Sequence, residues 1–299
     1  MKLPNFFCGG APKSGTTTIY DILKQHPQVF LPKLKEPNFF NREDYFKKGI
    51  EWYLKTFYNT SEEKKIIGDF TPSYLASEMV PHRILSFIGK DVKFLFILRN
   101  PVDRAYSHFL HNKRDEREPY DFETALQEEQ DRIIKYKKPD TYFLALKFGY
   151  VWQSLYANTI LTYRQLFGKE RVMVLIFEEL FADTPNCIKS ILDFLQIDKS
   201  INLDFNIASN PSSVARSKMI KKLITHDSVI KKGIKKIIPS VTMRKRIRKF
   251  LQKSNNQPKK YKSLEVAIKR NVYNTYFKND VEKLEVLIEK DLSHWKFDA

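Results

Sequence analysis

The chain has 299 residues, of which 42% are hydrophobic, and it contains few glycines. This composition suffices for one large folded domain and excludes a chain that is disordered over most of its length. No run of about 18 apolar residues is present, so the sequence predicts no membrane-spanning helix.

The net charge of +17 is concentrated in one segment. Residues 216–262 hold 17 Lys and Arg residues but a single acidic residue, Asp227. The rest of the chain is therefore nearly neutral, which favours a local anionic partner. A glycan acceptor, an anionic lipid surface, a nucleic-acid patch and a plain solvated helical face are the alternatives. Aromatic residues are scarce in this segment, which disfavours stacking on single-stranded nucleic acid, and no specific nucleic-acid partner is expected.

The pattern of apolar residues predicts four strand–loop–helix units. In chain order they are a strand at 3–8 with a helix at 16–25, a strand at 66–69 with a helix at 77–88, a strand at 92–99 with a helix from 101 to about 113, and a strand at 171–177 with a helix at 184–195. Further helices are expected at 121–136, 150–167 and 281–292, with Asn100 and Thr184 as helix caps.

This repeat indicates an α/β fold with three layers, in which a central, mainly parallel sheet is flanked by helices. We expect one domain over 1–299, with an α/β core at 1–213 and a basic, helical C-terminal part at 214–299. Cys8 and Cys187 are expected to be free thiols in the apolar interior, as a reducing cytoplasm allows.

Residues 9–18 read GGAPKSGTTT and join the first strand to the first helix. Such a loop is an anion site, because free backbone N–H groups and the positive end of the helix dipole point at it. Its glycines allow close approach of the backbone. A nucleoside-triphosphate P-loop has its lysine after the second glycine, whereas here Lys13 lies between Gly10 and Gly15 and Thr16 follows. Lys13 would lie beside a bound phosphate, near a bridging oxygen; a solvated lysine in a glycine turn is the alternative.

This loop resembles the 5′-phosphosulfate loop of sulfotransferases that use 3′-phosphoadenosine 5′-phosphosulfate. Residues 96–109, FILRNPVDRAYSHF, resemble the 3′-phosphate motif of the same family. The likeness extends over nearly the whole chain and is least specific in the basic segment. Residues 35–41, 49–53 and 68–75 resemble the heparan sulfate branch, and residues 287–295 resemble bacterial members. The resemblance implies a P-loop-like fold and the following donor-binding residues: Lys13, Ser14, Gly15, Thr16, Thr17, Thr18, Arg99 and Ser107.

The resemblance also implies in-line transfer of a sulfuryl group to a hydroxyl or amine, with a carbohydrate as the favoured acceptor. Lys13 would neutralise the leaving group, and Glu36 matches the catalytic glutamate of the family. Pairing of Glu36 with Lys33 or Lys35 is the alternative, and His108 and His111 are rival bases. No metal is expected, because the histidines and cysteines show no ligand spacing.

Further residues are candidates for contacts with the acceptor and with the adenosine of the donor. Asp69 and Tyr74 are candidates for the acceptor, with capping of the turn after the strand as the alternative for Asp69. Tyr150 or Trp152 is a candidate ring for the adenosine, with packing of these residues in the core as the alternative. The loop that closes over the donor in the family would supply Arg216 and Lys218 here; a solvated basic turn is the alternative.

No N-terminal anchor precedes the first strand, so a cytoplasmic enzyme of bacterial type is expected, with peripheral attachment at the inner membrane surface as a further option. Two other readings of the whole chain stay open. One is a P-loop kinase or NTPase, and the other is a non-catalytic protein that binds anionic glycan or lipid.

Overall fold

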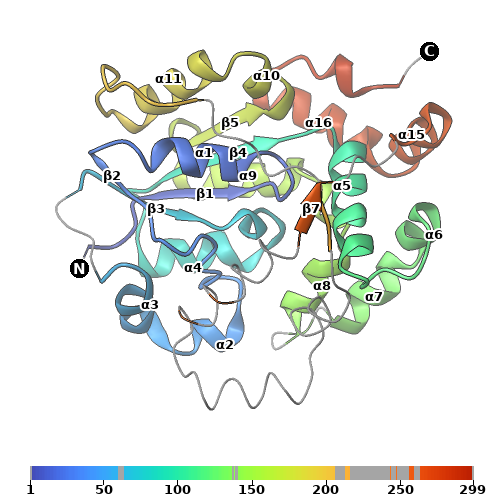
Figure 1. Cartoon of the computed structure of the whole chain (residues 1–299), viewed down its shortest axis with the longest axis horizontal. Helices are drawn as coiled ribbons and strands as arrows, with labels where there is room; N and C mark the ends of the chain where they lie inside the picture. The colour runs from blue at the N-terminus through green and yellow to red at the C-terminus, as the bar shows by residue number, and fades with distance from the viewer. Residues whose placement is uncertain are drawn as a thin grey trace.

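The computed structural model describes residues 2–59, 64–136, 138, 141–205, 213–215, 243, 247, 256–258 and 263–297. A five-stranded sheet with the order β2-β3-β1-β4-β5 lies at its centre (Figure 1). All four pairings in this sheet are parallel, which confirms the predicted α/β class. The strands are β1 (Phe6–Gly10), β2 (Val29–Phe30), β3 (Ile66–Phe70), β4 (Lys93–Leu98) and β5 (Val172–Ile176).

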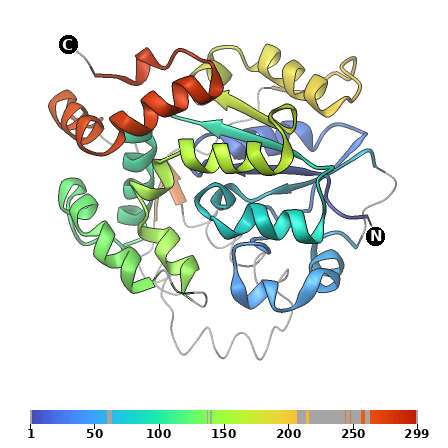
Figure 2. The same ribbon diagram turned by 180° about the vertical axis from the view of Figure 1, so that it is seen from behind.

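Helices cover both faces of the sheet, so the fold has three layers (Figures 1 and 2). One face carries α1 (Thr16–Leu23), α10 (Phe177–Ala182) and α11 (Thr184–Leu195). The other carries α4 (Met79–Phe87), α9 (Ala157–Phe167) and α16 (Lys278–Ile288). The other helices are α2 (Glu43–Phe46), α3 (Gly49–Phe57), α5 (Pro101–Arg114), α6 (Phe122–Gln127), α7 (Glu129–Tyr136), α8 (Tyr142–Phe148) and α15 (Val266–Val272); short helical turns are η1 (Pro72–Ala76), η2 (Trp152–Ser154), η3 (Lys169–Arg171), η4 (Tyr273–Phe277) and η5 (Ser293–Trp295).

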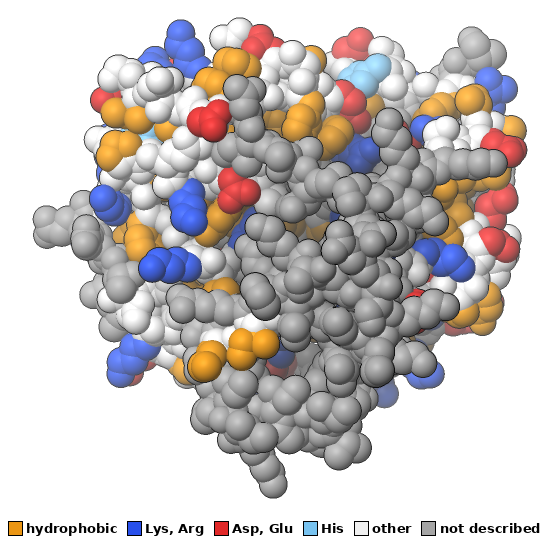
Figure 3. Space-filling model, in the orientation of Figure 1, with side chains coloured by type: hydrophobic (Ala, Val, Ile, Leu, Met, Phe, Trp, Pro, Cys, Tyr) orange, Lys and Arg blue, Asp and Glu red, His pale blue; other side chains and the backbone are white. Residues whose placement is uncertain are grey.

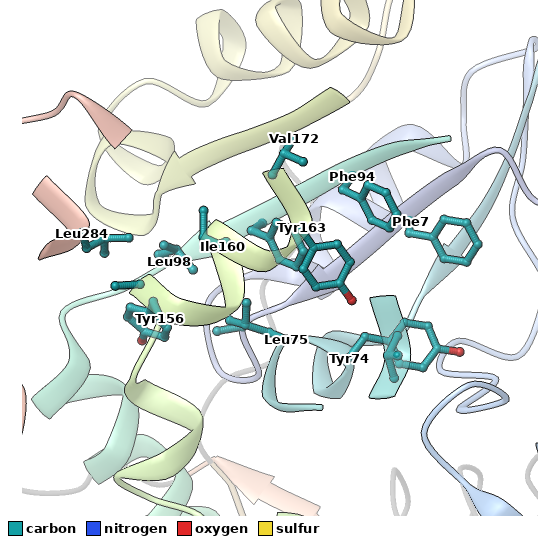
Figure 4. Packing of buried hydrophobic residues seen from close by; sticks show 14 of the residues in the cluster. Phe7, Tyr74, Leu75, Phe94, Leu98, Tyr156, Ile160, Tyr163, Val172 and Leu284 are labelled. Atoms are coloured by element: carbon teal, nitrogen blue, oxygen red, sulfur yellow. The ribbon is translucent and has the colours of Figure 1, made fainter. Parts of the chain in front are cut away.

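The apolar run of β4 is explained by burial on both sides. Leu95 and Ile97 belong to the core under α1 and α11, whereas Phe94, Phe96 and Leu98 belong to the core under α9. Alternate side chains of a strand point to opposite faces, so a strand with two covered faces must be apolar throughout. Figure 4 shows Ile160 and Tyr163 of α9 beside this second face.

The C-terminal helices pack onto the core that covers one face of the sheet. Leu284 of α16 and Trp295 are both 0% exposed and share a core cluster with Phe94 of β4. The strands β6 (Ser213–Ala215) and β7 (Asn256–Pro258) pair antiparallel, and β6 lies against α5. Our prediction of helix throughout this region was therefore wrong at β7.

Two of the predicted helices are interrupted, and the late start of the second has a tertiary cause. The helix expected at 121–136 divides into α6 and α7, and the helix expected at 150–167 begins only at Ala157. Glu129, at the start of α7, accepts hydrogen bonds from the backbone N–H groups of Val151 and Trp152 at 2.7 and 2.8 Å. A carboxylate from another helix thus holds the chain before α9 in a turn, which no local pattern reveals.

The predicted boundaries are correct where a cap is encoded locally. Asn100 Oδ1 accepts from the N–H groups of Val102 and Asp103 at 3.0 and 3.3 Å, which confirms it as the cap of α5. The cap of α11 is Asp183, one residue before the predicted Thr184. The edge strand β2 and the helices α2 and α3 were not predicted, and β1 runs two residues beyond the predicted end.

Basic and acidic side chains intermix on the described part of the surface shown in Figure 3, in agreement with its nearly neutral sequence. Most of the basic segment at 216–262 lies outside the described residues, so the alternatives for its partner stay open. Cys8 is buried, Cys187 is half-buried, and both are free thiols as expected. Among the described residues, no helix combines the length and apolar character needed to cross a membrane.

Candidate active site

The loop between β1 and α1 forms the floor of the candidate site. Gly15 caps α1 with φ 79°, a left-handed conformation that glycine adopts without strain. No side chain among the described residues caps the first turn of α1. Ser14 is 0% exposed, and its hydroxyl has no hydrogen-bond partner within the described part of the protein. A buried hydroxyl without a partner beside the start of a helix fits an anion as the missing acceptor, to which the hydroxyl would donate.

The other two glycines of the loop are required by close packing within the protein. A Cβ atom on Gly10 would come within 2.5 Å of Leu75 Cβ, and one on Gly9 would come within 2.6 Å of the Phe96 ring. Both glycines therefore let the end of β1 pass close to η1 and β4. Close approach of the loop backbone to a ligand at these positions stays a prediction.

Lys13 lies in this loop with its side chain exposed and its backbone at φ 73°. Part of the side chain is accessible to solvent, but many protein atoms lie close to it. The loss of solvation that they cause is the largest contribution that lowers the pKa of Lys13, to about 8. The charges of Arg114 and Arg99 lower this pKa further. Lys13 thus lies among other cations, and a bound anion would relieve the repulsion between them.

Arg99 meets the loop directly. Its Nη1 donates a hydrogen bond to the backbone carbonyl of Lys13 at 3.3 Å, and its guanidinium lies 4.7 Å from the centre of the Phe177 ring. Strands β1 and β4 are neighbours in the sheet, so their carboxyl ends bring the two sequence motifs to one edge. Ser107 is half-buried on the second turn of α5, which starts immediately after Arg99. Ligands of open α/β sheets bind at this edge.

Lys35 is a site residue that the sequence reasoning missed as a ligand contact. Its Nζ donates to Thr16 Oγ1 at 3.1 Å and to Thr17 Oγ1 at 2.8 Å, so a second ammonium group stands at the start of α1. Thr18 is buried one residue further along the helix. The sequence indicated Lys35 only through its position next to Glu36. That position does not predict which atoms the side chain contacts.

Glu36 follows Lys35 and is exposed. Its backbone adopts φ 62°, and its N–H donates to the carbonyl of Phe70 at 3.1 Å. Phe70 is the last residue of β3, so this hydrogen bond places Glu36 at the carboxyl edge of the sheet. The two residues predicted to be catalytic, Lys13 and Glu36, therefore both have positive φ, which is uncommon for residues other than glycine. Strained backbone of this kind gathers at functional sites.

The rival base His108 is placed differently. It is only 8% exposed, its ring lies 5.1 Å from that of Tyr150, and burial lowers its pKa well below the usual value. His111 lies 3.7 Å from Asp115 and 2.8 Å from a guanidinium nitrogen of Arg114. His108 is thus a neutral group of the interior, while Glu36 faces solvent.

Three other predicted contacts lie beneath the surface of the site. Asp69, Tyr74 and Tyr150 are each 0% exposed. The Tyr74 hydroxyl donates to Asp69 Oδ2 at 3.1 Å, and the Tyr150 hydroxyl donates to Glu118 Oε2 at 2.7 Å. Direct contact of these side chains with a ligand stays a prediction; in this structure they support the site from the core.

Arg216 and Lys218 lie outside the described residues. The strands β6 and β7, which precede and follow this part of the chain, pair with each other, and β6 lies against α5. In the part of the chain that the structure describes, no three His, Cys, Asp or Glu residues are grouped closely enough to hold a metal ion.

The start of a helix, two lysines and an arginine thus meet around one loop at one edge of the sheet. The family model for the sulfotransferase domain matches residues 3–284, so the chain belongs to the sulfotransferase family. A sulfotransferase from Alicyclobacillus acidocaldarius has a similar structure, with a TM-score of 0.68 and 25% identity over 99% of both chains.

Among curated proteins, the chain is similar to the membrane-associated sulfotransferase kil1 of Dictyostelium discoideum, with 38% identity over 44% of this chain and 29% of that protein. It is 40% identical to the bifunctional heparan sulfate N-deacetylase/N-sulfotransferase 4 of Mus musculus, over 38% of this chain and 14% of that protein. It is 28% identical to the heparan sulfate glucosamine 3-O-sulfotransferase 5 of Homo sapiens, over 69% of this chain and 58% of that protein. The chain thus spans less than two thirds of the length of each of these relatives.

Proposed function

We propose that this protein transfers a sulfuryl group from 3′-phosphoadenosine 5′-phosphosulfate to a hydroxyl or amine of a carbohydrate. One observation carries the proposal: the hydrogen bond from Arg99 Nη1 to the carbonyl of Lys13, at 3.3 Å, joins the two predicted donor-binding motifs at one sheet edge. Lys13, Lys35 and the start of α1 would hold the 5′ end of the donor, and Arg99 and Ser107 would hold its 3′-phosphate.

The donor supplies an activated sulfuryl group, whose bond to the 5′-phosphate oxygen breaks as a bond to the acceptor oxygen or nitrogen forms. Glu36 takes the proton from the acceptor, because its carboxylate is exposed and can reach an acceptor bound at this edge of the sheet. Lys13 neutralises the charge that develops on the phosphate oxygen, where the electron pair of the broken bond remains. Arg99 and Ser107 fix the register of the donor and take no part in proton transfer.

The acceptor class rests on the relatives, because two of them are named as heparan sulfate sulfotransferases. A carbohydrate acceptor is therefore proposed, without a choice between O- and N-sulfation. We also propose that the protein acts in the cytoplasm, where free thiols such as Cys8 and Cys187 persist. Attachment to a membrane surface is a further possibility that the membrane-associated relative supports.

Calorimetry and a transfer assay test the function. We expect 3′-phosphoadenosine 5′-phosphate to bind and ATP to bind far more weakly. Radiolabelled sulfate should pass from the donor to at least one member of a panel of glycans, amino sugars, lipid headgroups and small hydroxyl compounds. Lys13→Ala and Glu36→Ala should each abolish the transfer, while Lys24→Ala, an exposed lysine just beyond the far end of α1, should leave it unchanged. Preferential binding of ATP, or full activity of both site variants, would refute the proposal.

A further inference from the structure

The segment that carries Glu36 has an unusual backbone. Glu36 and Asn38 have φ values of 62° and 58°, so two non-glycine residues adopt left-handed conformations on either side of Pro37. Asparagine tolerates this conformation better than most residues, whereas glutamate does so rarely. Such a conformation persists only where surrounding contacts hold it.

Asn38 supplies those contacts with its side chain. Its Nδ2 donates to the carbonyl of Glu36 at 2.7 Å, and its Oδ1 accepts from Ser73 Oγ at 3.1 Å. Asn38 is only 8% exposed, so water competes little for either bond. The backbone of Glu36 is therefore tied through one amide side chain to η1.

The far end of this connection is anchored in the core. The backbone N–H of Asn38 donates to Thr71 Oγ1 at 3.4 Å, and the Thr71 hydroxyl donates to Asp69 Oδ1 at 2.6 Å. Asp69 Oδ2 also accepts from the hydroxyl groups of Tyr53 and Tyr74, at 2.7 and 3.1 Å. Asp69, Thr71 and both tyrosines have fully buried side chains, so this carboxylate is fixed from several directions.

We propose that Asn38 is a positioning residue, which holds the Glu36 backbone in its left-handed conformation and is itself held by Thr71 on Asp69. The inference rests on the proposed function, because it assigns Asn38 a role toward the general base. The carboxylate of Glu36 stands on a loop, and proton transfer requires its oxygen within hydrogen-bond reach of the acceptor. Asp69 thereby acts on the reaction from the core, without touching the acceptor.

Three variants separate positioning from folding. Asn38→Gly removes both side-chain hydrogen bonds but accepts the left-handed backbone without strain. Thr71→Val removes the hydroxyl that links Asn38 to Asp69, whereas Thr71→Ser keeps it. We expect Asn38→Gly and Thr71→Val to lower kcat by about 10- to 100-fold, since a small misplacement of a catalytic group has an effect of this order. Thr71→Ser should stay close to the parent protein.

The readouts are sulfate transfer to the best acceptor of the panel and calorimetric binding of 3′-phosphoadenosine 5′-phosphate. Binding should change less than about twofold in all variants, because none of the hydrogen bonds given for Asn38 and Thr71 reaches the donor loop. In a Glu36→Gln background, Asn38→Gly should cause no further loss of kcat, because the base it positions is already removed. Equal kcat for Asn38→Gly and the parent, or losses that multiply in the double variant, would overturn the inference while leaving the proposed function intact. Absence of donor binding and transfer in the parent would overturn the proposed function instead.

Discussion

The ammonium group of Lys35 lies 2.8 Å from Thr17 Oγ1, in the first turn of α1. This hydrogen bond joins the segment that carries Glu36 to the loop that carries Lys13. The two catalytic candidates come from different strand connections, and the Lys35 side chain links their segments. The loop proposed to hold the donor and the segment proposed to carry the base are thus joined by hydrogen bonds.

Replacement of Lys35 by methionine tests this link. Lys35→Met keeps the apolar stem but removes the charge at the start of α1, so donor binding should weaken by about 10-fold, the usual scale for one charge-assisted hydrogen bond. Titration of 3′-phosphoadenosine 5′-phosphate by calorimetry measures the change. Lys33→Met, an exposed lysine of the same segment, is the matched control and should bind like the parent. Equal affinities of the two variants would remove Lys35 from the site.

The lowered pKa of Lys13 predicts that donor binding depends on pH. Lys13 is protonated below a pKa of about 8 and loses its charge as the pH rises through that value. Affinity for 3′-phosphoadenosine 5′-phosphate should therefore fall between pH 7 and pH 9, where the phosphate groups are already ionised. Calorimetry at a series of pH values measures the trend. The Lys13→Ala protein should lack the pH-dependent step, and a step of equal size in that variant would assign it to another group.

Arg99 should act on the 3′-phosphate alone. In the parent protein, 3′-phosphoadenosine 5′-phosphate should bind more tightly than adenosine 5′-phosphate, which lacks that phosphate. Arg99→Ala should reduce this preference by about 10- to 100-fold, because a hydrogen bond to a charged group contributes about 1.5–3 kcal/mol. Arg171 lies immediately before the amino end of β5, at the sheet edge opposite the site. The control variant Arg171→Ala should therefore keep the full preference. A preference that survives in Arg99→Ala would place the 3′-phosphate elsewhere.

Glu36 and His108 can be compared as bases by isosteric replacement. Glu36→Gln should lower kcat by at least about 100-fold and leave donor binding nearly unchanged, as expected for loss of a general base. His108→Gln should change kcat much less, since His108 is buried and neutral. Steady-state transfer assays measure both. A larger loss for His108→Gln than for Glu36→Gln would exchange the two assignments.

The C-terminal end should contribute strongly to stability. Trp295 is 0% exposed, its Nε1 donates to Glu178 Oε2 at 3.2 Å, and its carbonyl accepts from Asn100 Nδ2 at 3.1 Å. Trp295→Ala should lower the free energy of unfolding by about 3–5 kcal/mol, as for other large-to-small core replacements. Urea denaturation measures this change. Val286→Ala, at a position that is 80% exposed on α16, should change it by less than about 0.5 kcal/mol.

The sequence predicted most of the sheet because its signals are local. The run at β4 is apolar on both faces, and Asn100 with Pro101 encodes the start of α5 within four residues. The edge strand β2 is only two residues long and carries no such pattern. The break before α9 depends on Glu129, a residue more than 20 positions away in the chain, so a local pattern cannot report it.

The sequence by itself determined the residue types of the proposed donor site, since the order of lysine, glycines and threonines around Lys13 predicts an anion loop from local chemistry alone. Only the tertiary structure decided which side chains reach that loop. Lys35 turns toward Thr16 and Thr17, while Asp69, Tyr74 and Tyr150 face the interior. The direction of a side chain depends on packing between segments distant in the chain, and a linear pattern does not contain that information.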